Sequence, residues 1–306
     1  MFKILSKESN IFSIPVYLGF LFLLIFIFNI LNFNHIEFIS ETITFIGIAL
    51  GYFLFNKINL NRQTHLPLFF YTFFVFALYP GNLDIGLSIA LLINSFLLLI
   101  LTNSNEKVRK NSFVIVGVLL AINFIFLPTT WPLLLFVIIH IIATSSKIGL
   151  NIFRLFFGIT LIAISYLLLS YSFDYRSFNM DYFPFSNFKP QEVWYPLILF
   201  LPIVAFLAIA ILSHFIHINE KSLENKYKYT FLLTFSAAQL VTIILYMNQN
   251  HEYLLLLSLP ASIILGRYVT YLPKYWMKEI SVWIIIFTLL IYKLGAYFDL
   301  AHLIFI

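Results

Sequence analysis

Uninterrupted stretches of uncharged residues restrict how this chain folds more than any other feature. Residues 9–34 contain 26 consecutive residues without Lys, Arg, Asp or Glu, and residues 111–139 contain 29. A helix needs about 20 apolar residues to cross a bilayer. Because 61% of the residues are hydrophobic and 10% are charged, the composition is that of a membrane protein. Helices satisfy their own backbone groups in lipid, so we predict an all-α transmembrane bundle.

Short polar segments divide the chain into eleven predicted spans, which form one integral membrane domain over residues 1–306. The first uncharged run is too long for the core of a signal peptide and is followed by no small-residue cleavage site, so we predict that it is retained. We place the spans near residues 11–33, 38–55, 66–79, 85–102, 111–127, 132–146, 155–173, 194–216, 229–247, 253–271 and 280–298.

The fifth and sixth spans are separated by two prolines. Residues 111–146 are too many for one span of about 20 residues. Pro128 and Pro132 each lack a backbone N–H, and a proline inside a helix also clashes with the preceding turn. We therefore predict a hairpin, with one span ending at Leu127 and the next beginning at Pro132.

The positions of Lys and Arg favour an N-terminus inside and a C-terminus outside. With eleven spans, 15 of the 18 basic residues lie inside, and only Arg176, Lys189 and Lys293 lie outside. If residues 111–146 were one span, the division would be 10 against 8. Positive residues are retained on the cytoplasmic side of membranes. This bias supports the hairpin, and it accounts for the net charge of +5 without a nucleic-acid partner.

The longest polar interruption, residues 174–193, is predicted to be an outer loop. Arg176 and Lys189 are predicted to lie outside, whereas most basic residues lie inside. They are therefore candidates for binding a phosphate or diphosphate group. Pairing with acidic residues of the same loop is the alternative. The loop is also a candidate surface for docking another envelope protein, because it carries the aromatic residues Tyr175, Tyr182, Phe183 and Phe185.

Two glutamates near the first outer loop are candidate catalytic groups. Glu37 and Glu41 are four residues apart, so they share one face if the second span begins as a helix before Phe38. A carboxylate at the membrane interface can act as a general base toward a hydroxyl group. The alternative is a solvated helix start, where acidic residues interact favourably with the helix dipole.

The segment 248–267, NQNHEYLLLLSLPASIILGR, resembles the closing part of membrane glycosyltransferases with the GT-C fold. The matching positions are His251, Tyr253, Leu259, Pro260, Ala261, Gly266 and Arg267. The resemblance implies a GT-C-like bundle that transfers a sugar from a polyprenyl-phosphate lipid at the outer leaflet, with Glu37 or Glu41 as the base. Substrate and phosphate would then be bound at the outer face by Asp84, Arg176, Lys189, His251 and Glu252.

The whole chain is also similar to an uncharacterised family of Phe-rich inner-membrane proteins from Bacteroidota. The similarity rests on residues 92–101 with the basic loop after them, and on the hairpin FLPTTWPLLLFVIIH at residues 126–140. It implies a multi-pass protein of a bacterial inner membrane and supplies no activity.

The sequence contains little evidence for several other classes of function. The chain has no Cys, which excludes disulfides and thiolate metal sites. It contains no nucleotide-binding or hydrolase motif, so we predict no cofactor, and a requirement for a divalent metal stays open. A transporter would need a polar path through the bundle, for which the mid-span candidates are Asn94, Asn123, His140 and Gln239. Interhelical hydrogen bonding is the alternative role of such residues.

Overall fold

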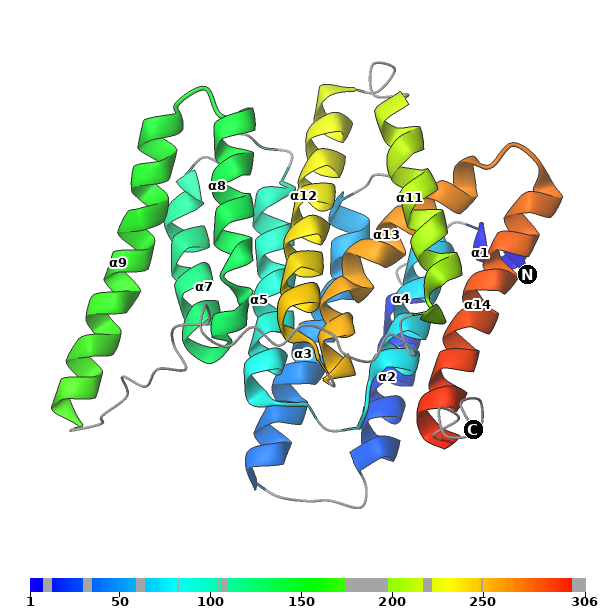
Figure 1. Ribbon diagram of the computed structural model, residues 1–306, viewed down its shortest axis with the longest axis horizontal. Helices are drawn as coiled ribbons and strands as arrows, with labels where there is room; N and C mark the ends of the chain where they lie inside the picture. The colour runs from blue at the N-terminus through cyan, green and yellow to red at the C-terminus, as the bar shows by residue number, and fades with distance from the viewer. Residues whose placement is uncertain are drawn as a thin grey trace.

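The computed structural model describes residues 1–7, 13–29, 35–58, 64–81, 83–103, 105, 109, 111–173, 198–216, 222–248 and 250–298. Within these ranges every regular element is a helix, which confirms the all-α class (Figure 1). The predicted outer loop 174–193, with Arg176 and Lys189, lies outside the described residues.

The described elements are one short α-helix at the N-terminus, longer α-helices and two short 3-10 turns. They are α1 (Phe2–Leu5), α2 (Ser13–Asn29), α3 (His35–Ile58), α4 (His65–Leu78), α5 (Ile85–Leu101), α7 (Phe113–Phe126), η1 (Pro128–Thr130), α8 (Pro132–Thr144), α9 (Ile148–Ser172), α11 (Leu201–Ile216), α12 (Leu223–Tyr246), η5 (His251–Leu254), α13 (Leu255–Tyr271) and α14 (Tyr275–Phe298).

Four stretches of the described chain are helical, long and apolar enough to cross a membrane: Phe38–Phe55, Ile148–Ser172, Glu224–Tyr246 and His251–Tyr271. Shorter apolar helices accompany them, among them α4, α5, α7 and α11. Many large apolar side chains on the outside of the bundle are exposed, for example Phe153, Leu168 and Ile216. An exposed apolar surface of this extent is typical of a membrane protein.

The long helices pack in two rows. One row contains α9, α7, α5 and α3, each in contact with the next, and the other contains α8, α12 and α13. Helix α13 joins the rows to the rest of the molecule, because it contacts α4, α5, α11, α12 and α14. Its span is 78% buried, whereas that of α9 is 11% buried, so α13 forms the centre and α9 the periphery.

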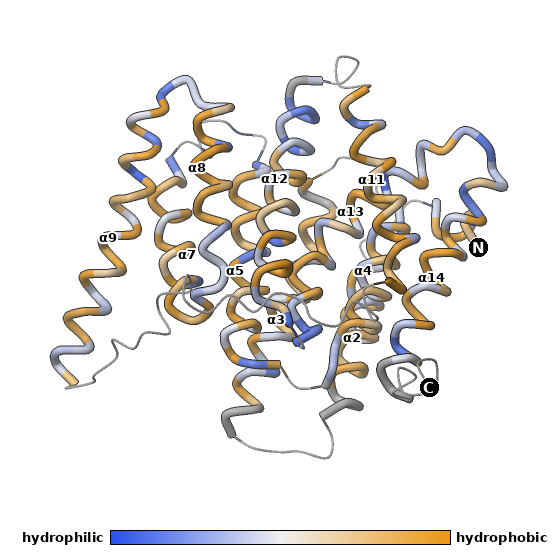
Figure 2. Tube along the Cα trace, in the orientation of Figure 1, coloured by the Kyte–Doolittle hydropathy of each residue, from blue (hydrophilic) through white to orange (hydrophobic). Residues whose placement is uncertain are grey.

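Basic residues gather at one end of the bundle. Successive long helices run in alternating directions, and the helix ends at the top of Figure 1 carry Lys147 before α9, Lys226 at the start of α12 and Lys278 at the start of α14. We name this the basic end. The acidic end, opposite it, holds Asp84 before α5 and Glu252 in η5. Figure 2 shows hydrophilic positions gathered toward the ends, with mostly hydrophobic helix between them.

The predicted hairpin between the fifth and sixth spans is present. Helix α7 ends at Phe126, η1 forms the turn, and α8 begins at Pro132. Proline suits the first helical position because its missing N–H has no partner to lose there. The turn is held to α12 by Trp131, whose Nε1 donates a hydrogen bond to the hydroxyl of Tyr246 over 2.7 Å.

Several helices extend beyond the predicted spans. Helix α9 begins at Ile148 instead of 155, and α12 begins at Leu223 instead of 229. The prediction followed apolar content, but a helix continues into the polar interface wherever its backbone hydrogen bonds persist and polar side chains find partners. Asn151 in the first turn of α9, for example, donates to the Oγ of Ser145 over 3.1 Å.

Candidate functional site

Three turns meet at the acidic end of the bundle. They are the segment before α5 that holds Asp84, the turn η1, and η5 with the residues before it. The hydroxyl groups of Thr129 in η1 and Tyr253 in η5 lie 3.3 Å apart and share a hydrogen bond. Asp84 and Glu252 interact electrostatically with Tyr253 and with each other. This convergence brings residues that are far apart in the sequence into one cluster, which we name the acidic cluster.

Asp84 is fixed by its position at the start of α5. Its carboxylate accepts a hydrogen bond from the backbone N–H of Gly86 over 3.1 Å and caps the helix. Such a cap satisfies one of the first N–H groups of the helix, which have no partner inside it. The side chain is otherwise exposed at the end of the bundle. A carboxylate in this position is both held in place and accessible.

Glu252 is partly buried in the turn that leads into α13. Asn248, just before this turn, has a φ of 40°, a left-handed conformation that asparagine tolerates better than most residues. Next to Glu252, the Nδ1 of His251 is buried and makes no hydrogen bond within the described part of the chain. The turn therefore carries an imidazole and a carboxylate on consecutive residues, directly before the most buried helix.

The start of α3 is bonded to the loop that holds Asp84. The Oγ of Ser40 donates to the carbonyl oxygen of Leu83 over 2.7 Å and shares a hydrogen bond with Ser88 over 2.9 Å. Glu41 follows Ser40 directly and is partly exposed. Glu41 thus belongs to the acidic end of the bundle.

Helix α3 begins at His35, so the helical start on which the pairing of Glu37 with Glu41 depends is present. The side chain of Glu37 lies outside the described residues, as do Arg176 and Lys189. Of the predicted site residues, the structure places Glu41, Asp84, His251 and Glu252 at the same end and brings Asp84 and Glu252 together.

The acidic cluster is suited to proton transfer. The carboxylate of Glu252, which is partly buried with that of Asp84 nearby, can act as a proton acceptor. Such a pair can take a proton from a substrate hydroxyl, and the neighbouring imidazole and phenol can donate hydrogen bonds. No group of three or more His, Asp or Glu side chains suitable for a metal ion occurs in the described part of the chain.

The mid-span polar residues do not form one path in the described bundle. Gln239 bonds to Asn94, and the Nε2 of His140 shares a hydrogen bond of 2.8 Å with the hydroxyl of Tyr227. Asn123 is buried on α7 with no hydrogen-bond partner for its amide among the described residues. The first two pairs join neighbouring helices, which is the packing role considered for such residues.

A cavity at the basic end was not predicted from the sequence. It has a volume of about 620 Å³ and is lined by residues that include His214, Tyr229 and Arg267. The sequence analysis placed Arg267 on the inner side of the membrane and in the segment that resembles GT-C enzymes, and it assigned this residue to no cavity. One feature of the sequence could have indicated the cavity. An Arg, a His and several Tyr occur at three helix ends that the predicted topology puts on the same side of the membrane.

Comparison with curated proteins finds no match, and comparison with solved structures finds none either. A protein-family model does match, and it extends over residues 1–298, nearly the whole chain. The chain therefore belongs to DUF6427, a family of unknown function.

Proposed function

We propose that this protein is a GT-C-like glycosyltransferase of a bacterial inner membrane, which transfers a sugar from a polyprenyl-phosphate lipid at the outer leaflet. The observation that carries the proposal is the acidic cluster, in which Asp84 and Glu252 interact at the end of the bundle opposite the basic residues. The resemblance of residues 248–267 to the closing part of such enzymes also supports it, and this segment includes η5 and most of α13.

The proposal includes eleven spans with the N-terminus inside. Its support is the alternating direction of the long helices together with the position of the basic residues. Lys147, Lys226 and Lys278 lie at one end, where the positive-inside rule expects cytoplasmic residues. Lys293 lies near the other end of α14, and its ammonium group donates to the backbone oxygen of Tyr79 over 2.7 Å.

In the proposed reaction the acidic cluster activates the acceptor. A carboxylate of the Asp84–Glu252 pair accepts the proton of an acceptor hydroxyl. At the same time, the hydroxyl oxygen forms a bond to the anomeric carbon of the donor sugar. The bond from that carbon to the phosphate oxygen breaks, and polyprenyl phosphate leaves with the electron pair. Cationic side chains stabilise the departing phosphate, for which Arg176 and Lys189 are the predicted candidates.

The two carboxylates have different roles in this scheme. Glu252 is partly buried beside Tyr253 and lies at the entrance to α13, so it is our candidate for the base. Asp84 is exposed and held by the N–H of Gly86, so it positions the acceptor and keeps Glu252 available for a proton. Glu37 and Glu41, near the start of α3, remain alternatives for the base.

The test uses substitutions that preserve shape and remove charge. Glu252→Gln and Asp84→Asn are introduced separately and expressed in a strain that lacks its own copy of the gene. We expect each to abolish the surface glycan supplied by the wild-type protein, and to reduce release of polyprenyl phosphate by the purified protein at least about 100-fold. Glu37→Gln and Glu41→Gln test the alternative base.

The matched control is Glu224→Gln at the basic end. Glu224 is exposed and pairs with the buried Lys228 over 2.7 Å at the opposite end of the bundle, so its substitution removes a carboxylate without touching the acidic cluster. This variant should retain full activity. If Glu252→Gln, Asp84→Asn, Glu37→Gln and Glu41→Gln all leave the glycan unchanged in correctly inserted protein, the enzyme proposal is wrong. A non-catalytic membrane subunit that docks a partner through residues 174–193 then becomes the better hypothesis.

A further inference from the structure

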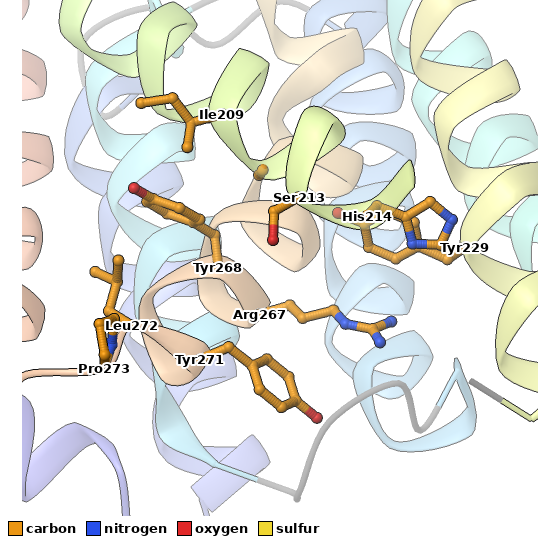
Figure 3. Close-up of a pocket in the computed structure, with 10 residues that line it drawn as sticks. Ile209, Ser213, His214, Tyr229, Arg267, Tyr268, Tyr271, Leu272 and Pro273 are labelled. Atoms are coloured by element: carbon orange, nitrogen blue, oxygen red, sulfur yellow. The ribbon is translucent and has the colours of Figure 1, made fainter. Parts of the chain in front are cut away.

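The cavity at the basic end lies between the last turns of α11 and α13 and the first turns of α12 (Figure 3). It is far from the acidic cluster, since the two lie at opposite ends of α12 and α13. Its volume of about 620 Å³ falls within the range of small-molecule sites in proteins. The proposed transfer reaction makes no use of it.

Positively charged and hydrogen-bonding side chains form the floor of the cavity. Arg267 and His214 are 8% and 3% exposed, and Tyr229 is 2% exposed. In Figure 3 the guanidinium group of Arg267 extends toward the His214 and Tyr229 rings. Because arginine stays protonated in proteins, the floor carries a permanent positive charge.

Aromatic rings hold the guanidinium group of Arg267 in one orientation. The guanidinium carbon lies 4.7 Å from the ring centre of Tyr229 and 5.7 Å from that of Tyr271. The imidazole of His214 stacks on Tyr229 with a centre-to-centre distance of 4.0 Å and an angle of 27°. A guanidinium group held between rings is oriented before a ligand arrives, so less entropy is lost on binding.

The mouth of the cavity is lined by hydroxyl groups and apolar side chains, whereas its floor is cationic. Ser213 and Tyr271 are exposed at the mouth and supply hydroxyl groups. Ile209, Leu272 and Pro273 provide an apolar wall beside them. The exposed face of α11 continues this apolar surface through Leu212 and Ile216. A ligand in this cavity therefore contacts a cationic floor and an apolar wall at the same time.

We infer that this cavity binds the phosphate group of an anionic phosphate ester, with Arg267 as the principal contact. Arginine presents donors in a fork that matches phosphate oxygens, and the neighbouring imidazole and phenols add further donors. A phosphate group alone fills a small part of 620 Å³, so the ligand carries an additional organic group.

The location of the cavity favours a lipid as the source of the ester. The proposed topology puts the basic end at the inner leaflet, where anionic head groups are concentrated. Basic pockets between transmembrane helices on this side are known binding sites for phosphate-bearing head groups. A soluble phosphate ester has the same chemistry, and the experiment separates the two sources.

Binding is measured by native mass spectrometry and by the shift of the melting temperature of the purified full-length protein in detergent. The lipid arm uses dihexanoylphosphatidylglycerol, with dihexanoylphosphatidylcholine for comparison. The soluble arm uses inorganic phosphate and glycerol 3-phosphate. We expect the anionic lipid to bind at least about tenfold more tightly than the zwitterionic lipid, because its head group has a net negative charge.

Three variants in the cavity and one control outside it locate the site. Arg267→Gln should weaken binding at least about tenfold, whereas Arg267→Lys should retain part of it because the charge stays and the forked geometry is lost. Ser213→Phe should block the mouth from an exposed position without removing a charge. Lys147→Gln removes a charge at the same end outside the cavity, and it should bind like the wild type.

The outcomes separate clearly. Tight binding of the anionic lipid that Arg267→Gln and Ser213→Phe both weaken supports a lipid ligand, and binding of glycerol 3-phosphate with the same pattern supports a soluble ester. Binding that Lys147→Gln reduces as strongly as Arg267→Gln does would overturn the inference. Failure of every probe to bind would overturn it as well. Glycan transfer in these variants is a separate readout, so the inference and the proposed function can fail independently.

Discussion

The side-chain amide of Gln239 on α12 donates a hydrogen bond of 3.2 Å to the Oδ1 of Asn94 on α5, in the interior of the bundle. Both residues are almost fully buried, with exposed fractions of 1% and 4%. The bond links the two rows of helices near their middle, where the surrounding side chains are apolar. Such amide pairs hold helices together in membranes, because an amide without a partner is costly in an apolar environment.

The first prediction concerns this amide pair. Asn94→Leu and Gln239→Leu should each lower the free energy of unfolding by about 1 kcal/mol, since each leaves the other amide buried alone. The double variant should cost less than the sum of the two, because no amide is then left without a partner. Equilibrium unfolding in mixed micelles measures all four proteins. Strict additivity would show that the two side chains do not interact.

The second prediction separates two contacts of Tyr227. Its hydroxyl is bonded to His140, and its ring is covered by the guanidinium group of Arg109 at 3.7 Å. Tyr227→Phe removes only the hydrogen bond and should cost about 1 kcal/mol. Tyr227→Leu also removes the ring and should cost more, by about 0.5–1 kcal/mol. Thermal unfolding in detergent measures both, and equal losses would mean that the Arg109 contact adds nothing.

The third prediction concerns the attachment of the peripheral helix α9. Gly117 on α7 faces the backbone oxygen of Leu155 on α9, and Gly158 on α9 faces that of Val114 on α7. At either glycine a Cβ atom would overlap this backbone oxygen, and backbone cannot move aside as a flexible side chain can. Because most contacts of α9 are with α7, Gly117→Ala and Gly158→Ala should loosen α9 specifically.

Limited proteolysis and the melting temperature measure this loosening. Gly149→Ala is the control on the same helix, since within the described chain no atom beyond its own helix backbone and chain neighbours lies within 4 Å of the added Cβ position. That variant should be neutral or stabilising by up to about 1 kcal/mol, because alanine favours a helix over glycine. Equal behaviour of Gly149→Ala and Gly117→Ala would show that the close approach of α7 and α9 is unimportant.

The membrane class, the hairpin and the helical elements could be predicted from the sequence. Backbone in lipid must be helical, so apolar runs interrupted by polar turns leave few alternatives, and two prolines determine where the hairpin turns. Gly47 marks a close approach of α3 to α5, since an added Cβ would lie 2.9 Å from the backbone nitrogen of Leu92. These features depend on local sequence.

The contacts between distant helix ends could not be predicted in this way. Asp84 and Glu252 are both polar residues in short turns, and no periodicity indicates which turns adjoin one another. The central position of α13 is equally hidden, because its apolar composition is similar to that of lipid-facing helices. Arg267 illustrates the limit most clearly. Its position at a helix end indicated a side of the membrane, whereas its role in a cavity depends on side chains from α11 and α12.

The fourth prediction separates the structural and chemical roles of Asp84. Asparagine caps helices about as well as aspartate, so Asp84→Asn should leave the melting temperature nearly unchanged. Asp84→Ala loses the bond to the N–H of Gly86 and should cost about 1 kcal/mol. If the proposed function is correct, both variants lose glycan transfer. A fully active Asp84→Asn would limit this residue to its capping role.

The last prediction tests the orientation in the membrane, on which both proposals depend. The chain contains no cysteine, so a single introduced thiol is the only labelling site and the wild type gives no background. Lys147 at the start of α9 and Asn250 before η5 are both exposed, and they lie at opposite ends of the bundle. The described helices α9, α11 and α12 lie between them in the chain, and the proposed topology counts these as three crossings. In spheroplasts, a membrane-impermeant maleimide should label Asn250→Cys and leave Lys147→Cys unlabelled until the membrane is permeabilised. The reverse pattern would place the acidic cluster in the cytoplasm, where a polyprenyl-linked donor at the outer leaflet cannot reach it.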